Sequence, residues 1–234
     1  MITIAALWRY PVKSLGAEPL ESAELTTEGI VGDRIVHVRG PLGLLTGRTR
    51  HGLLTVPTTT GPDGVPQVAG HLWHTQSAHD VVRAHAGAEA ELAAYSGPER
   101  FDVLSLLVAT DGAVHRFGHD VRRLRPNLLL AGVSAEDEPT WPGRAIAVGE
   151  VLIGVHSVRG RCVVPSIDPD SGERNRDITR RIRREFGGEL ALNCWVIRPG
   201  PLHVGDHAQL VPTTEQPKHL GGWIVGAPYP LTAR

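Results

Sequence analysis

Short runs in which apolar and polar residues alternate cover much of the chain, a pattern typical of β-strands. Residues 2–8 form the first run, which is rich in β-branched side chains and ends before Pro11. Residues 32–38 and 44–46 flank a Gly-Pro-Leu-Gly turn and predict a hairpin. Further strands are expected at residues 103–109, 128–131, 145–155 and 192–197, and in a last segment through Val211.

Two segments instead repeat apolar residues at the spacing of an α-helix. Residues 77–95 are rich in alanine and begin with Ser77, a common helix N-cap residue. Residues 177–186 place three large apolar side chains at i, i+4 and i+8 and stop at two glycines. The arginines of this second helix fall on its other faces, where a solvated surface is the simpler interpretation and a binding role is the alternative.

A Gly97-Pro98 pair after the first predicted helix marks the best candidate for a domain boundary. The 27 glycines and 18 prolines are dispersed, which indicates many turns in a folded protein rather than a fibrous or disordered chain. We therefore expect two β-rich parts, residues 1–96 and 97–234, in a fold that is mostly β with a few helices (α+β).

The composition describes a nearly neutral globular protein. Hydrophobic residues make up 41% of the 234 residues, and 24 Lys and Arg stand against 25 Asp and Glu, a formal charge of −1. Such a balance gives no bulk attraction to nucleic acid or to an acidic membrane, so neither is expected as a partner. No apolar run reaches the ~18 residues of a membrane span, and no signal peptide pattern opens the chain. We expect a cytoplasmic protein.

The chain has two cysteines, and their surroundings differ. Cys162 lies between an apolar run and a turn, close to Arg159 and Arg161, and nearby positive charge favours a thiolate that can act as nucleophile or soft-metal ligand. A small buried hydrophobic residue is the alternative for any isolated cysteine. Cys194 has only apolar and uncharged neighbours and is interpreted as a core residue.

Several basic residues occur where the backbone is expected to turn: Lys13 before Ser14, Arg34, Arg48, and Arg125 before Pro126 and Asn127. Arginine forks and a Lys-Ser pair suit phosphate oxygens, whereas ordinary surface charge explains each segment taken singly. His115 and His119 have the i, i+4 spacing of helical metal ligands, but neighbouring glycines weaken the helix that this would need.

Together these segments resemble the MOSC family, the molybdenum cofactor sulfurase C-terminal domain proteins, preceded by the family's N-terminal β-barrel extension. The matching blocks occur in the family's order and cover nearly the whole chain. They are Tyr-Pro-Val-Lys-Ser at 10–14, Gly-Asp-Arg at 32–34, Arg-Pro-Asn at 125–127, Arg-Cys at 161–162 with Asp-Pro-Asp-Ser-Gly at 168–172, and Pro-Gly at 199–200 with Val-Gly-Asp at 204–206.

The resemblance implies an N-terminal β-barrel-like part packed on a MOSC β-barrel domain, with a molybdenum cofactor (molybdopterin) in the cleft between them. It makes Cys162 the metal ligand and the catalytic residue. It assigns six residues to cofactor binding, with the terminal phosphate at Lys13, Ser14 and Arg34, and the pterin or phosphate path at Arg125, Asn127 and Arg161.

Relatives with this extension reduce N-hydroxylated compounds such as amidoximes and hydroxylamines, so the resemblance implies a molybdenum-dependent oxidoreductase acting on a small-molecule substrate. The chain's two cysteines cannot supply the four thiolates of a plant-type iron–sulfur cluster. We therefore expect an external electron donor, a ferredoxin or a flavoprotein reductase.

Two alternatives remain open. One is a sulfur-transfer or cofactor-carrier protein that uses a Cys162 persulfide, and the other is a biosynthetic protein with altered chemistry. Residues 102–105 read Asp-Val-Leu-Ser, where many members place Thr or Ser directly after the aspartate, and residues 111–121 form a shorter segment than the usual helix-bearing one. Both departures concern the substrate side of the site.

Overall fold

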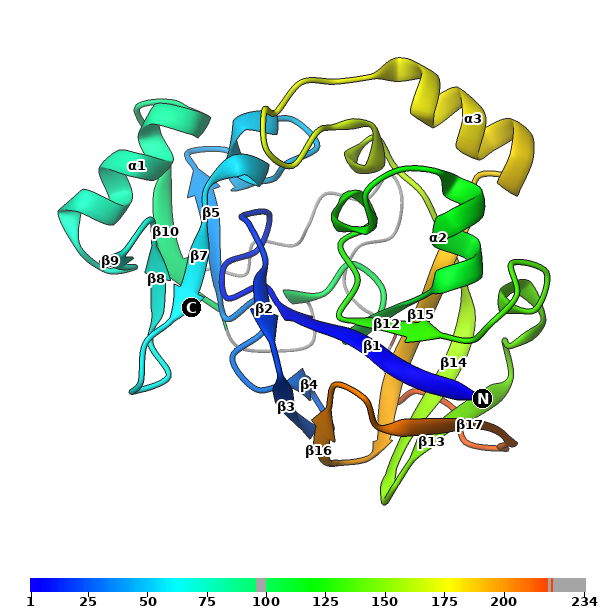
Figure 1. Ribbon diagram of the computed structural model, residues 1–234. Coiled ribbons are helices and arrows are strands. Elements are labelled where there is room, and N and C mark those ends of the chain that lie inside the picture. Colours follow the sequence, from blue (N-terminus) through cyan, green and yellow to red (C-terminus); the bar gives the residue numbers. More distant parts are fainter. Residues whose placement is uncertain (96–99, 219, 221–234) are drawn as a thin grey trace.

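The structure, a computed structural model, describes residues 1–95, 100–218 and 220. Its centre is a closed barrel of seven strands (Figure 1). Around the barrel the order is β12 (Leu128–Ala131), β11 (Leu106–Thr110), β15 (Glu189–Arg198), β14 (Val151–Gly160), β13 (Arg144–Val148), β17 (His207–Pro212) and β1 (Ile2–Arg9). The pairing of β1 with β12 closes the ring, and β2 (Glu18–Leu20) pairs with the end of β1. The expectation of a mostly β fold that contains a barrel is confirmed.

Strand β1 connects the first residues of the chain to strands that come much later. Thr3 pairs with Ala131 of β12 on one side and with His207 of β17 on the other. The register shifts between Ile4 and Ala6, a β-bulge that lets the strand bend around the barrel. The barrel therefore includes residues from both sides of the expected boundary at Gly97, which itself lies outside the described residues. That boundary stays a prediction.

Three smaller sheets and three α-helices complete the described part of the chain. The sheets are β10 (Glu91–Ala94) with β5 (Val36–Gly40) and β6 (Gly43–Leu45), β16 (Gly200–His203) with β3 (Ser22–Thr26) and β4 (Gly29–Ile30), and β7 (Thr58–Thr60) with β8 (Pro66–Val68) and β9 (His71–Leu72). The helices are α1 (Gln76–Ala86), α2 (Asp111–Phe117) and α3 (Arg176–Phe186), and short 3-10 turns are η1 (His51–Thr55), η3 (Val121–Leu124), η4 (Glu138–Thr140) and η5 (Val164–Ser166).

Each part of the molecule has its own hydrophobic core. The barrel interior is filled by alternating aliphatic side chains of its strands, and Cys194 is one of its fully buried members. A second core lies between α1 and the β5, β6 and β10 sheet and includes Val36, Val38 and Val82. The two cores have no member in common.

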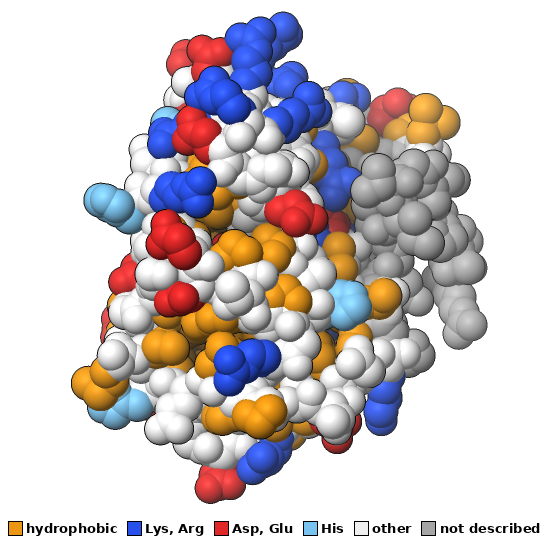
Figure 2. Space-filling view, turned by 90° about the vertical axis from the view of Figure 1, so that its right-hand side faces the viewer, with side chains coloured by type: hydrophobic (Ala, Val, Ile, Leu, Met, Phe, Trp, Pro, Cys, Tyr) orange, Lys and Arg blue, Asp and Glu red, His pale blue; other side chains and the backbone are white. Residues whose placement is uncertain are grey.

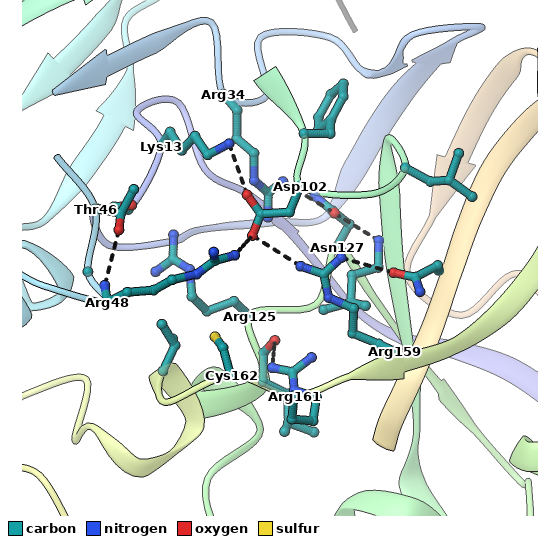
Figure 3. A pocket seen from close by; sticks show the side chains of 18 of the residues that line it. Lys13, Arg34, Thr46, Arg48, Asp102, Arg125, Asn127, Arg159, Arg161 and Cys162 are labelled. Atoms are coloured by element: carbon teal, nitrogen blue, oxygen red, sulfur yellow. Dashed lines mark hydrogen bonds and ion pairs between the residues drawn. The ribbon is translucent and has the colours of Figure 1, made fainter. Parts of the chain in front are cut away.

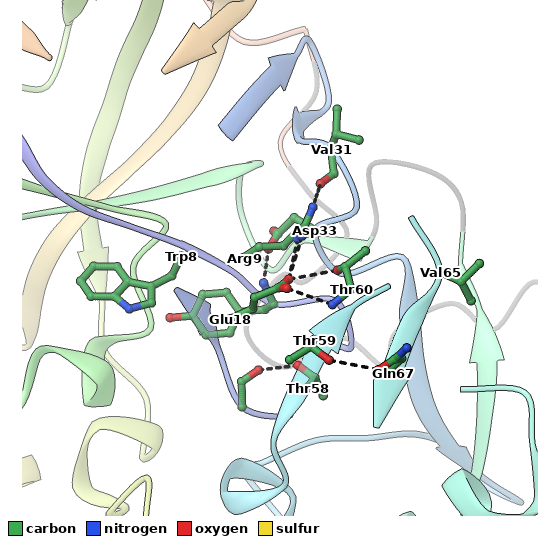
Figure 4. A network of polar contacts seen from close by, with 12 residues as sticks. Trp8, Arg9, Glu18, Val31, Asp33, Thr58, Thr59, Thr60, Val65 and Gln67 are labelled. Carbon is green, nitrogen blue, oxygen red and sulfur yellow. Dashed lines mark hydrogen bonds and ion pairs between the residues drawn. The ribbon is translucent and has the colours of Figure 1, made fainter. Parts of the chain in front are cut away.

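A polar network ties β1 and β2 to β7 (Figure 4). Glu18 receives two bonds from Arg9, at 2.8 and 2.9 Å, and two from the backbone and hydroxyl of Thr60, both at 3.0 Å. Arg9 also donates to the carbonyl of Val31 at 3.2 Å. The network joins a barrel strand to the small β7 sheet and so limits movement between the two parts.

Helix α3 forms where its apolar spacing predicts a helix. Asn175 caps its start by accepting a hydrogen bond from the backbone of Asp177 at 3.0 Å, and Gly187 ends it with φ 64°. Ile178 and Ile182 are buried against α2 and η3 in a small third core. The burial of one apolar stripe leaves the arginine-bearing faces toward solvent.

Two expected elements are wrong in part. The helix expected at 77–95 is α1, which begins after Thr75 as N-cap and stops at Gly87, because Gly87 adopts φ 112°. Residues 91–94 instead pair with β5 as strand β10. The single strand expected at 145–155 is the hairpin of β13 and β14, which turns at Gly149 with φ 54°. In both places a glycine in the left-handed region ends the element.

Candidate functional site

An open cleft lies between the barrel and the β5 sheet, and its empty space is about 820 Å³ when the open solvent at its mouth is included (Figure 3). Every residue that the sequence analysis assigns to the site lines it: Lys13, Ser14, Arg34, Arg125, Asn127, Arg161 and Cys162. More than a hundred positions separate the first of them from the last. These residues therefore lie together in the folded chain, as predicted. The role of each residue stays a prediction.

The lining side chains come from loops at the ends of barrel strands. Lys13 and Ser14 follow β1, Arg125 follows η3 just before β12, and Arg161 and Cys162 directly follow β14. The edge of the barrel thus brings together loops that are distant in sequence. We call this space, with the residues given above, the cationic cleft.

Backbone strain is concentrated in the cationic cleft. Ser14 (φ 74°), Arg34 (φ 54°) and Arg125 (φ 58°) adopt the left-handed conformation, which costs energy for residues other than glycine. In the described chain only two further non-glycine residues do so, Ala69 and Ala191. A strained backbone conformation persists only where the surrounding structure holds it. Here the three strained residues place two guanidinium groups and a hydroxyl in the same cleft.

Asp102 is the shared counter-ion of three cations. Its carboxylate lies 3.0 Å from Lys13 Nζ, 2.6 Å from an Arg48 nitrogen and 3.1 Å from an Arg159 nitrogen. Burial alone would raise the pKa of Asp102, but the three cations together hold that pKa well below its usual range. The carboxylate is therefore charged at neutral pH.

Lys13 and Arg159 are themselves largely buried. Burial lowers the pKa of each, and Asp102 opposes part of that shift. Lys13 also donates to the carbonyl of Arg100 at 2.9 Å, and Arg159 to the side chain of Asn193 at 3.2 Å. Both acceptors are uncharged, so these bonds position the two cations without cancelling their positive charge.

A second network holds Arg34 and Asn127. The fully buried Asp33 forms an ion pair with Arg34 and accepts bonds from the backbone of Tyr10 at 2.8 Å and from Asn127 at 3.3 Å. Asn127 accepts a bond from the backbone of Leu107 at 3.2 Å. Asn127 therefore bridges a barrel strand to the loop that carries Arg34, a positioning role that leaves Arg34 fixed beside the cleft.

Tyr10 supports two of the cations with its ring. The guanidinium carbons of Arg34 and Arg125 lie 4.6 and 4.3 Å from its ring centre, within the range of cation–π contact. Its hydroxyl donates to the carbonyl of Pro126 at 3.0 Å, and burial raises the pKa of Tyr10 to about 12. The phenol stays neutral, and its ring face stabilises the adjacent positive charges.

Arg125 and Arg161 carry buried donors that have no partner in the described protein, Nη2 of Arg125 and Nε of Arg161. Burial lowers the pKa of each guanidinium to about 10, so both remain charged at neutral pH. A buried cationic donor without an acceptor is costly unless an anion meets it. Among the described lining residues, six are cationic and one is a carboxylate, which leaves the cleft suited to an anionic ligand.

The two cysteines occupy contrasting places. Cys162 is a half-buried free thiol, and its sulfur faces the cationic cleft (Figure 3). Cys194 is fully buried in the barrel core, where burial raises the pKa of its thiol. The interpretation of Cys194 as a core residue is confirmed, and Cys162 is the thiol that a ligand in the cleft can reach.

Three charged residues of the cleft, Arg48, Asp102 and Arg159, are outside the set assigned to cofactor binding, although the sequence already marks Arg48 as a cation at a turn and Arg159 as a cation near Cys162. Arg159 could have been found by periodicity, because it lies two positions before Arg161 at the end of a strand and so shares its face. Asp102 gives no comparable signal, since its three partners come from two loops and the end of β14, all distant in sequence. The place of this carboxylate among the cations of the cleft can be recognised only from the three-dimensional structure.

The histidine alternative fails on geometry. Helix α2 does form at residues 111–117, but it ends at Gly118, so His119 lies beyond it and the i, i+4 face is lost. Within the part of the chain that the structure describes, no three His, Cys, Asp or Glu residues are grouped to hold a metal ion by themselves. A metal at Cys162 would need its other ligands from a bound cofactor.

The MOSC domain model matches residues 82–209, and the MOSC N-terminal beta barrel domain model matches residues 1–65. The chain belongs to the MOSC family. All seven predicted site residues fall within these two matches.

Individual relatives are distant. The chain is 32% identical to the molybdenum cofactor sulfurase of Anopheles gambiae over 80 residues, which are 34% of this chain and 10% of that protein. The chain thus spans about a tenth of that relative. The YuaD protein of Bacillus subtilis has a similar fold, with a TM-score of 0.50 and 13% identity over 91% of this chain and 97% of its own. YiiM of Escherichia coli aligns with a TM-score of 0.44 and 14% identity over 92% and 70%.

No helix in the described ranges is both long and apolar enough to span a membrane. The expected cytoplasmic location stays a prediction.

Proposed function

We propose that this MOSC protein binds a molybdenum cofactor in the cationic cleft and reduces N-hydroxylated compounds there. One observation carries the proposal: Cys162 shares a cleft with six cations, two of which hold buried donors that no group of the described protein satisfies. Soft thiolate and anion-binding donors are the two kinds of group that a phosphorylated dithiolene cofactor of molybdenum requires.

The donor set fits the phosphate of such a cofactor. Lys13, Ser14 and Arg34 offer an ammonium, a hydroxyl and a guanidinium from fixed backbone positions, two of them in the left-handed conformation. Asp102 and Asp33 hold Lys13 and Arg34 in place but balance only part of the positive charge. A bound phosphate would complete this balance.

The opposite side of the cleft fits the pterin end. Arg125 and Arg161 line the cleft and each carries one buried, unsatisfied donor, and Asn127 accepts a hydrogen bond from Arg34 at 3.4 Å. The thiol of Cys162 would be the protein's ligand to the metal. When bound, the molybdenum centre supplies the two-electron oxygen-removal chemistry.

The reaction consumes two electrons and two protons for each N–O bond, so that R–NHOH becomes R–NH2 and water. Within the cleft the protein's part is to bind, orient and exclude solvent. Leu104, Leu107 and Phe101 line the cleft beside its polar groups and offer an apolar surface to the organic part of a substrate. Arg159 and Arg161 place two positive charges in the same cleft as the Cys162 sulfur.

The experiment compares the two cysteines. Protein loaded with molybdenum cofactor is assayed for bound molybdenum and for benzamidoxime reduction driven by reduced methyl viologen. We expect about one molybdenum per chain, loss of turnover in Cys162→Ala, and retained turnover in Cys194→Ala, its matched control. Loss in Cys194→Ala with normal activity in Cys162→Ala would contradict the proposal. A cyanide-releasable sulfur on Cys162 without any turnover would favour a sulfur carrier instead.

A further inference from the structure

A second positive surface lies outside the cationic cleft, on α3 and the residues just before it. Its exposed arginines are Arg174, Arg176, Arg180, Arg183 and Arg184. Lys and Arg side chains gather at the top of the molecule in Figure 2, the end at which Figure 1 places α3. The chain as a whole carries a charge of only −1, so this is a local concentration of charge. We call these five residues the α3 surface.

Part of this charge is unbalanced. Arg180 pairs with Asp177 at 2.8 Å, and Arg184 pairs with Glu185 at 2.7 Å. Arg174, Arg176 and Arg183 have no acidic partner among the described residues. An excess of positive charge therefore faces solvent along the helix.

The neighbouring loop does not add to this excess. Arg122 pairs with both Asp120 and Asp170, at 2.6 and 2.7 Å, and Arg123 pairs with Asp168. These basic side chains are matched by carboxylates within their own cluster. This loop therefore adds no net positive charge to the α3 surface.

The α3 surface connects to Cys162 by a short path of bonds. The backbone N–H of Asn175, the N-cap of α3, donates to the carbonyl of Ser166 at 2.7 Å. The N–H of Ser166 donates to the carbonyl of Val163 at 2.9 Å, and Val163 is covalently linked to Cys162. Electrons tunnel through covalent and hydrogen bonds more readily than across gaps, so this path suits electron entry.

We propose that the α3 surface is the docking site for an acidic electron-donor protein of the ferredoxin type. The inference rests on the proposed function, because it needs a reducible centre at Cys162. Electrostatic steering by unbalanced arginines speeds the encounter of a negatively charged partner. One helix face also matches the small interfaces typical of transient electron-transfer pairs. A one-electron donor must dock twice for each N–O bond reduced, which favours a fast and weak complex.

The first test measures binding and does not depend on activity. The triple variant Arg174→Gln, Arg176→Gln, Arg183→Gln removes the unpaired charges and keeps good helix-forming residues. Its control, Arg39→Gln, Arg144→Gln, Arg198→Gln, removes the same charge from exposed positions on β5, β13 and β15. Circular dichroism verifies that both variants are folded.

Each protein is titrated with a plant-type [2Fe–2S] ferredoxin at low ionic strength. We expect the α3 triple to bind at least ten-fold more weakly than the wild type and the control, and we expect added salt to remove this difference. Equal affinity of the two triples would overturn the docking site. A single-stranded oligonucleotide that binds more tightly than ferredoxin, and is lost in the same triple, would also overturn it.

The second test separates docking from the proposed function. Benzamidoxime reduction by cofactor-loaded protein is driven either by reduced ferredoxin or by reduced methyl viologen. We expect the α3 triple to lose about ten-fold in the ferredoxin-driven rate and to keep the viologen-driven rate. An unchanged ferredoxin-driven rate would overturn the docking site alone. No turnover with viologen would overturn the proposed function, and the ferredoxin titration would still decide the docking site.

Discussion

The cationic cleft and α3 are both rich in arginine, yet the two regions hold their charge in different ways. In the cleft, buried cations share few carboxylates, and Arg34 and Arg125 sit on left-handed backbone. On α3 most of the arginines are exposed on a regular helix; Arg180, Arg181 and Arg184 pair with acids one, three or four positions away, whereas Arg176 and Arg183 form no ion pair among the described residues. The number of arginines does not distinguish a ligand site from a solvated face, whereas burial, shared counter-ions and unsatisfied donors do.

The difference has an energetic consequence. Exposed ion pairs contribute little to stability, since water screens them and their long side chains lose freedom. A buried ion removed from its partners costs several kcal/mol, since the partners keep their desolvation penalty. Substitutions in the cleft and on α3 should therefore differ sharply in their effect on the free energy of unfolding.

The strongest test of this contrast is Asp102→Asn. The change leaves Lys13, Arg48 and Arg159 without their shared carboxylate, and we expect the free energy of unfolding to fall by about 3 kcal/mol. Urea denaturation followed by far-UV circular dichroism measures the loss.

Phosphate provides the control for this variant. If the loss comes from uncompensated cations, millimolar phosphate should stabilise Asp102→Asn more than it stabilises the wild type, since an anion replaces the missing charge. A variant as stable as the wild type would show that the cations do not depend on Asp102.

The cysteines provide a second test. Cys194→Ala removes a fully buried side chain from the barrel core, and we expect a loss of about 1–2 kcal/mol in the free energy of unfolding. Cys162→Ala changes a half-buried loop residue and should leave that free energy within about 0.5 kcal/mol of the wild type. Chemical denaturation of both variants measures these free energies of unfolding. Equal losses in the two variants would contradict the assignment of one cysteine to the core and the other to the cleft.

A third test uses pH. Burial lowers the pKa of His37 to about 4, below its ordinary 6.5, and its Nδ1 has no hydrogen-bond partner in the described structure. The folded protein therefore binds this proton less readily than the unfolded chain does. The stability that His37 contributes is fully present above pH 6.5 and is lost as the pH falls toward 4.

The variant His37→Phe keeps an aromatic ring against Tyr95 and removes the titration. Thermal unfolding at intervals between pH 7 and 5 should show a shallower decline for this variant than for the wild type. The exposed His207 supplies the matched control, and His207→Phe should leave the decline unchanged. A decline that is identical in all three proteins would refute the role of His37.

The smallest effect is expected on α3. Arg180→Ala breaks the exposed pair with Asp177 and should change the free energy of unfolding by less than about 0.5 kcal/mol. Urea denaturation at low and high salt checks this. A loss comparable to that of Asp102→Asn would remove the contrast between the two regions.

Much of the fold could be predicted from local patterns. Runs of apolar and β-branched residues predict β1, β12, β15 and the β5–β6 hairpin, and apolar spacing predicts α3, which buries one regular face. The pattern fails at residues 91–94, where an alanine-rich segment has helix propensity but pairs with β5. Tertiary pairing overrides propensity there, and no local signal reports it.

The candidate site could be predicted only in part. The resemblance of the motifs predicts that Lys13, Arg34, Arg125 and Cys162 belong to one site, and all four line the same cleft. Asp102 could not be assigned, because its function as a counter-ion depends on three segments that meet only after the barrel closes. Strained conformations such as that of Arg125 are likewise absent from any local pattern, since the surrounding packing imposes them.

The pairing of β1 with β12 and β17 sets the order of events during synthesis. Ile2 and Thr3 are synthesised long before their partners Ala208 and His207, which belong to the last strand of the barrel. Until that strand emerges, β1 has an open edge with unpaired backbone groups, which other chains can bind. Such distant pairing also slows folding. The barrel therefore cannot close until its last strand has been synthesised, and the edge of β1 stays open to wrong pairing for that whole interval.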